Sequence, residues 1–167
     1  MRVPSYRMES VAGITSRDVP VRLVMTWAAQ VDRWRPFIDY RSDTRWYRLL
    51  ERTEDHEVWL LSWLPGQGTD LHDHGPAAGA FTVATGTLTE RVIATPLGRP
   101  PVVQISVLSV GGWRAFGPHY IHQLTNAGTV AAVSVHAYTP ALTVMNRYRL
   151  ESQGLRHIGA ERVGVDW

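Results

Sequence analysis

Residues 66–86 read GQGTDLHDHGPAAGAFTVATG, and this stretch decides both the expected fold and the expected chemistry of the chain. Side chains of a β-strand alternate between its two faces, so His72 and His74 point one way and Asp73 points the other way. A third histidine, His122, comes later and is closed by Asn126. Two imidazoles on one strand face, with a third from another strand, form a divalent-metal site. We therefore expect a metalloenzyme whose metal ligands are His72, His74 and His122.

Composition excludes several other classes of protein. The 167 residues are 44% hydrophobic and 19% charged, which suits one domain with a sizeable core. The chain has no cysteine, which excludes disulfides, zinc ribbons and cysteine nucleophiles, so any sulfur chemistry must act on a substrate. Its net charge is only +2, and its arginines are interleaved with acidic residues, so no nucleic-acid partner is expected. Short apolar runs and the lack of a signal-peptide pattern favour a cytoplasmic protein with no membrane partner, and we expect a monomer.

The apolar period changes from helical to strand-like near residue 46. Residues 17–35 have helical spacing, with Pro20 suited to a first turn and Pro36 discouraging continuation. Strands are predicted at 46–51, 57–64, 71–74, 79–84, 87–94, 102–110, 113–116, 120–125, 130–138, 142–150 and 155–163. Eight to eleven short strands after one helix predict an all-β fold, an antiparallel β-barrel or jelly roll with an N-terminal α-helix. Residues 1–16 are expected to be an irregular lead-in.

The glycine and histidine spacing matches the first cupin signature. That match is Gly66-(five residues)-His72-Asp73-His74-(four)-Gly79-(six)-Gly86, with glycine at position 79 where the signature has a glutamate ligand. The second signature is present in part, in residues 111–126. A three-histidine site without the carboxylate resembles the thiol dioxygenases of the cupin superfamily, the cysteine dioxygenase family in particular. Three further segments are similar to that family: Trp46-Tyr47-Arg48, His122-Gln123-Leu124-Thr125-Asn126 and Ser134-Val135-His136-Ala137-Tyr138-Thr139-Pro140.

The resemblance implies a single cupin domain over residues 1–167, with a helical lead-in at 1–40 and the β-barrel at 45–163. It implies one iron(II) ion per chain, held by the three histidines, and a small thiol and O2 as substrates. Cysteine would be converted to cysteine sulfinic acid. Arg48 would hold the substrate carboxylate, with Arg45 as the alternative.

The residues of 134–138 also carry an expectation of their own. Ser134, His136 and Tyr138 recur with period two and therefore share one face of a strand. Buried polar groups need partners, and a hydrogen-bonded relay that ends at the Tyr138 hydroxyl near the iron would supply them. We expect these three residues to tune the oxygen site. The missing carboxylate favours an anionic ligand from the substrate, and Gly79 is expected to leave room beside the metal.

Three alternatives remain open. The substrate is 3-mercaptopropionate or another small thiol, or the protein is a non-catalytic metal-binding cupin. The third alternative, a zinc or manganese isomerase or decarboxylase, would require the missing glutamate.

Overall fold

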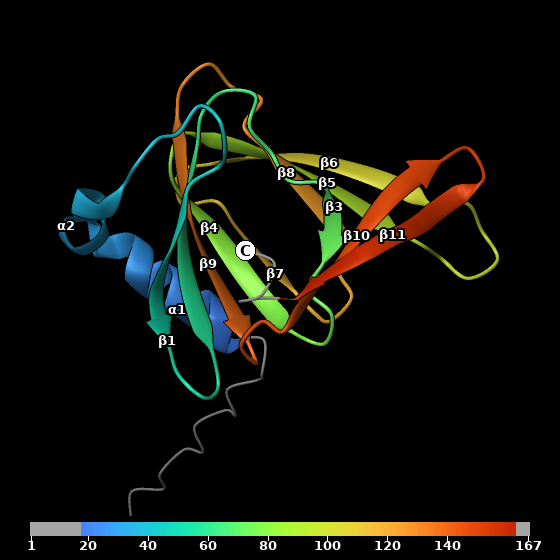
Figure 1. Ribbon diagram of the computed structural model, residues 1–167, viewed down its shortest axis with the longest axis horizontal. Helices are drawn as coiled ribbons and strands as arrows, with labels where there is room; N and C mark the ends of the chain where they lie inside the picture. Colours follow the sequence, from blue (N-terminus) through green and yellow to red (C-terminus); the bar gives the residue numbers. More distant parts are fainter. Residues whose placement is uncertain (1–17, 163–167) are drawn as a thin grey trace, which may run out of the picture.

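The computed structural model describes residues 18–162, and in this part of the chain two antiparallel sheets carry a helical segment on one side (Figure 1). The N-terminal segment contains α1 (Asp18–Ala29), α2 (Val31–Trp34) and a 3₁₀ helix, η1 (Arg35–Phe37). The strands are β1 (Tyr47–Arg52), β2 (Glu57–Trp63), β3 (Leu71–Asp73), β4 (Ala78–Thr85), β5 (Thr87–Ala94), β6 (Val102–Ser109), β7 (Trp113–Phe116), β8 (His122–Thr125), β9 (Ala132–Thr139), β10 (Val144–Glu151) and β11 (Gly154–Arg162). The all-β prediction with an N-terminal helix is confirmed. The lead-in expected at 1–16 lies outside the described residues.

The two sheets have different strand orders. One sheet runs β1-β2-β9-β4-β7, and the other runs β11-β10-β3-β8-β5-β6. Helix α1 packs on the outer face of the first sheet, against β4 and β9 (Figure 1). The second sheet faces the inner side of the first sheet, and the candidate functional residues lie between the two sheets.

The segment predicted as one helix over 17–35 is divided at Gln30, which has φ −91° and ψ 54°. The carbonyl of Trp27 there accepts hydrogen bonds from the Gln30 backbone N–H and from the Trp34 indole, each at 3.0 Å. Trp34 is still buried, with 1% of its surface exposed. The helical spacing of apolar residues thus continues past Gln30, although the helix itself is interrupted there. No helix within residues 18–162 combines the length and apolar character needed to cross a membrane.

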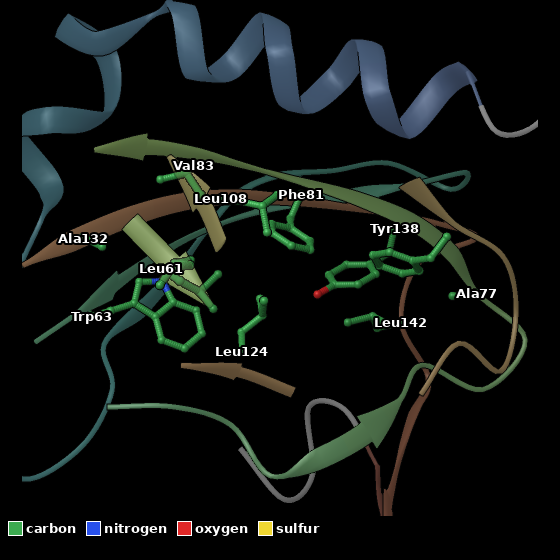
Figure 2. Packing of buried hydrophobic residues seen from close by; sticks show 12 residues of the cluster. Leu61, Trp63, Ala77, Phe81, Val83, Leu108, Leu124, Ala132, Tyr138 and Leu142 are labelled. Carbon is green, nitrogen blue, oxygen red and sulfur yellow. The ribbon is translucent and has the colours of Figure 1, made fainter. Parts of the chain in front are cut away.

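Alternation along the central strands divides the core in two. One cluster lies under α1 and includes Leu60, Val133 and Val135. The other lies between the sheets and includes Trp63, Phe81, Leu124 and Tyr138, and Figure 2 shows these side chains on the side of the sheet away from the helix. Strands β2, β4 and β9 are covered on both faces, so most of their residues are buried. Polar residues on the inner face of β9 must therefore find partners within the protein.

Candidate metal centre

Three histidines meet between the sheets. His72 lies on β3, His74 directly follows that strand, and His122 begins β8 as the cross-strand partner of His72. Each has at most 3% of its surface exposed. One ring nitrogen from each lies within 4.8 Å of the others, and the group contains no carboxylate. The structure thus brings together the three histidines that the sequence singled out, and they can hold a metal ion.

The far nitrogens of two of these rings have acceptors. Nδ1 of His72 lies 2.9 Å from the carbonyl oxygen of Asp70, and Nδ1 of His122 lies 3.0 Å from Oε1 of Glu90. A carbonyl and an ionised carboxylate only accept, so each Nδ1 carries a hydrogen, and Nε2 is the nitrogen left for a metal ion. Metal-binding histidines typically have such a partner on the second nitrogen.

His74 supplies the strongest sign that a metal belongs here. It is buried, yet neither of its ring nitrogens has a hydrogen-bond partner among the described residues. A buried polar atom without a partner is costly, and a bound cation would satisfy it. Burial, together with the charges of neighbouring histidines, lowers the pKa of His72 and of His74 well below the ordinary value. Both rings are therefore neutral near pH 7, which is the form that binds metals.

The position of the usual glutamate ligand is closed rather than open. Gly79 lies on β4 opposite Phe116 on β7. A Cβ atom at Gly79 would lie 2.7 Å from two ring carbons of Phe116 and 2.7 Å from the carbonyl oxygen of Ala137. The expectation that Gly79 leaves room beside the metal was therefore wrong, because the Phe116 ring fills that room. The same ring stacks on His74, with centroids 5.1 Å apart and planes at 20°.

The polar residues of β9 form a connected chain. The indole N–H of Trp63 donates to Ser134 Oγ at 2.9 Å, and Ser134 Oγ lies 2.8 Å from His136 Nε2. His136 Nδ1 lies 3.5 Å from the Tyr138 hydroxyl oxygen, a long contact. The Trp63 indole can only donate, so Ser134 Oγ accepts from it and can donate its own hydrogen bond to His136 Nε2. In that tautomer His136 carries its hydrogen on Nδ1, which faces the Tyr138 hydroxyl oxygen. The Tyr138 hydroxyl proton is left for the cavity.

Burial sets the protonation of this chain. It lowers the pKa of His136 well below the ordinary value, assisted by the charges of His122 and Arg45. It raises the pKa of Tyr138, so the phenol keeps its proton throughout the physiological range. The Tyr138 ring centroid lies 4.7 Å from that of His74. A neutral hydrogen-bond donor therefore lies beside the three histidines.

A cavity of about 40 Å³ opens between the relay and the histidines. Its wall includes Arg45, Trp59, His72, His122, His136 and Tyr138. A single water needs roughly 10–15 Å³ on this measure, so the cavity has space for a molecule of only a few heavy atoms. The cavity therefore admits only small molecules.

The two candidate arginines face opposite ways. Arg48 is exposed, pairs with Leu60 and places its guanidinium 4.0 Å over the ring of Phe37, on the helix side of the sheet. The structure does not bring Arg48 to the cavity. Arg45 lines the cavity instead, with its guanidinium 4.8 Å over the Trp63 ring.

The Arg45 side chain has hydrogen-bonding capacity to spare. Its Nε is buried and has no hydrogen-bond partner among the described residues, and its Nη1 has only a long contact of 3.4 Å to the carbonyl of Gly68. Burial lowers the pKa of Arg45, but an arginine stays charged near neutral pH. Arg45 is therefore a partly desolvated cation that can receive an anion.

Glu90 was missed by the sequence analysis. It is fully buried on β5 and accepts hydrogen bonds from His122, from Arg114 at 2.7 Å and from Tyr120 at 3.3 Å. Burial acts to raise the pKa of Glu90, but hydrogen bonds and charge from His122 and Arg114 outweigh it and hold the pKa below the ordinary value. The available signal was alternation, which places Glu90 on the same face as the apolar Leu88.

Comparison with known proteins gives both a family and a fold. A family model described as cysteine dioxygenase type I matches residues 13–151. No curated protein matches the chain.

Similar solved structures have a low sequence identity to the chain. A Thermus thermophilus protein is 17% identical, with 64% of this chain and 93% of that one covered and a TM-score of 0.55. An uncharacterized Klebsiella pneumoniae protein with a double-stranded β-helix domain is 18% identical, with coverage of 78% and 95% and a TM-score of 0.51. An oxalate oxidase in complex with glycolate is 17% identical, with coverage of 60% and 53% and a TM-score of 0.53. At these identities the likeness shows the fold alone, which is the double-stranded β-helix of the cupins.

Proposed function

Since the chain belongs to the cysteine dioxygenase type I family, we propose that it is an iron(II)-dependent dioxygenase that converts cysteine and O2 to cysteine sulfinic acid. The observation that carries this proposal is a buried three-histidine group without a carboxylate, next to a small cavity that contains a charged arginine. Three neutral ligands leave the full charge of a divalent ion available to an anionic substrate. A thiolate is such an anion.

The reaction needs no further reductant. The sulfur of R–SH gains both atoms of O2 and becomes R–SO2H, so the four electrons that reduce dioxygen come from the sulfur. Iron(II), when bound, supplies the activation of dioxygen and the positive charge that holds the thiolate. The remaining tasks belong to the residues of the cavity.

Arg45 is proposed to bind the substrate carboxylate. Its unpartnered Nε and its planar guanidinium can form two parallel hydrogen bonds to a carboxylate, which lysine cannot reproduce. Arg45 and the histidines line one small cavity. We therefore propose that the substrate carries a thiol at one end and a carboxylate at the other.

Tyr138 is proposed to donate its hydroxyl proton as a hydrogen bond to the reacting substrate. His136 and Ser134 hold the phenol oxygen in place and accept no net charge, since both His136 and Tyr138 are neutral near pH 7. Their contribution is therefore orientation rather than proton storage.

A second substrate is supported by the cavity wall. Among the described lining residues there is no aspartate or glutamate to meet an ammonium group. A thiol acid without an amine, 3-mercaptopropionate, therefore suits the cavity as well as cysteine does. Only the amine distinguishes the two candidates.

The decisive experiment loads the protein anaerobically with iron(II) and follows oxygen uptake with cysteine, 3-mercaptopropionate and cysteamine, which lacks the carboxylate. We expect uptake with one of the two acids, a product heavier by two oxygen atoms, and little turnover of cysteamine. The His122→Ala variant should lose iron, whereas His157→Ala, on β11, should retain it. No uptake with any thiol by the iron-loaded protein would contradict the proposal and favour a non-catalytic metal-binding cupin.

A further inference from the structure

Glu90 is the buried hydrogen-bond partner of one candidate metal ligand, His122. Its carboxylate is fully buried, and both oxygens are occupied. Oε1 faces Nδ1 of His122 at 3.0 Å and the Tyr120 hydroxyl at 3.3 Å, while Oε2 accepts from Nε of Arg114 at 2.7 Å. A buried carboxylate is costly to desolvate, and here three residues from two strands and a loop hydrogen-bond to the one negative charge.

The three histidines differ in what lies behind them. The far nitrogen of His72 meets a neutral carbonyl, that of His74 has no partner among the described residues, and that of His122 meets an anion. A carboxylate behind an imidazole fixes the tautomer and makes the other nitrogen a stronger donor to a metal. His122 is therefore the strongest donor of the three.

The surroundings of Glu90 increase the effect of its charge. The Phe116 ring stacks on Tyr120, with centroids 5.3 Å apart and planes at 10°, and the same ring contacts His122 and His74. These stacked rings keep water away from the contact between Glu90 and His122, and Coulomb interactions strengthen where water is excluded. Phe116 also fills the space beside Gly79, so no carboxylate side chain can stand at position 79. Glu90 instead places its carboxylate at the far nitrogen of His122.

We propose that Glu90 is a positioning residue which, through His122, sets the affinity of the centre for a divalent cation and lowers the reduction potential of bound iron. It does so by providing, from behind a ligand, the negative charge that Gly79 does not provide. This inference rests on the proposed metal centre. Its chemical class is a carboxylate–histidine–metal arrangement, in which the oxidised ion gains more from the nearby anion than the reduced ion does.

The test compares two buried glutamates. Glu90→Gln keeps the shape of the side chain and removes its charge. The matched control is Glu57→Gln, because Glu57 is also fully buried and paired with an arginine, Arg52, but contacts none of the three histidines in the described hydrogen bonds. The readouts are the affinity of the apoprotein for Co²⁺ and Fe²⁺, measured by chelator competition, and the midpoint potential of the iron-loaded protein.

We expect Glu90→Gln to weaken metal binding about 10–100-fold and to shift the potential in the positive direction, while Glu57→Gln changes neither. Glu90→Asp, which keeps the charge but shortens the reach, should recover part of the affinity. If Glu90→Gln folds poorly because Arg114 is left unpaired, the double variant Glu90→Gln/Arg114→Gln removes that charge, and its metal affinity must still fall.

Two outcomes overturn different statements. Wild-type affinity and potential in the Glu90→Gln or double variant would overturn the role of Glu90 and leave a purely structural ion pair. Failure of the wild-type protein to bind either cation would overturn the metal centre itself, and the proposed function with it.

Discussion

Phe116 lies directly opposite Gly79 on the neighbouring strand, and its ring occupies the volume that any side chain at position 79 would need. The two residues together explain how a carboxylate is kept out of the centre. Glycine at position 79 alone would leave a gap that water or an anion could enter. Glycine facing an aromatic ring closes it, and the ring also orients His74 by stacking.

Gly79→Ala should destabilise the protein by about 1–3 kcal/mol, the usual cost of forcing an extra methyl group into a packed core. The new Cβ would press on both the Phe116 ring and the Ala137 carbonyl. Gly159→Ala is the matched control, because a Cβ there meets nothing within 4 Å. Urea unfolding measures the difference, and adding Phe116→Leu to Gly79→Ala should relieve part of the penalty. Equal stability of the two alanine variants would contradict the closed packing.

Arg45→Gln should raise the KM for the carboxylate-bearing thiol by about tenfold or more, since a charge-assisted hydrogen bond is worth about 1.5–3 kcal/mol. Arg48→Gln should leave KM unchanged, because its guanidinium lies over Phe37 on the other side of the sheet. Oxygen-uptake kinetics measure both variants. If Arg48→Gln raised the KM and Arg45→Gln did not, Arg48 would be the residue that binds the substrate carboxylate.

The two arginines also show what the sequence could and could not decide. Alternation separates Trp46, Arg48 and Leu50 from Tyr47 and Leu49, but both sets contain large apolar residues, so neither is marked as the inner face. Pairing with β2 resolves the question, since Arg48 faces Leu60 and Tyr47 faces Leu61. A partner strand is long-range information that one segment does not carry.

Other outcomes follow the same division between local and long-range signals. The strands were predictable because Gly and Pro turns and period-two patterns are local. The break at Gln30 was not, because Trp34 keeps the helical spacing while its indole bonds the Trp27 carbonyl. The burial of Glu90 depends on Arg114 and His122, which are distant along the chain.

Tyr138→Phe should lower kcat about 10²-fold with a smaller change in KM, as expected for loss of a hydrogen bond made mainly in the transition state. The fold should persist, since only one buried oxygen is removed. Tyr148→Phe is the control: its hydroxyl donates to Asp73 at 2.8 Å, and it does not line the described cavity. A kcat equal to that of the control would place Tyr138 outside the chemistry.

The metal-free protein should lose stability as the pH falls below about 6.5. In the folded state the pKa values of His72, His74 and His136 lie well below that value, so these three rings take up protons there only in the unfolded chain. Each ring contributes up to about 1.4 kcal/mol per pH unit, present above the unfolded pKa and lost in more acidic solution. Urea unfolding at a series of pH values measures the slope, and His136→Gln should reduce it. A stability independent of pH in this window would contradict neutral burial of these rings.

The pairing of His72 with His122 is the single register contact that joins β3 to β8. The six-stranded sheet therefore divides into two three-stranded ribbons, β11-β10-β3 and β8-β5-β6. They are joined by this pair and, just before β3, by the bridge between Gly68 and Thr125. A cation bound by both imidazoles would link the two ribbons at the pairing of β3 with β8, which is the shortest in the sheet. Loading the centre should thus slow amide exchange along that seam, because a bound ion would stabilise the contact between the two ribbons.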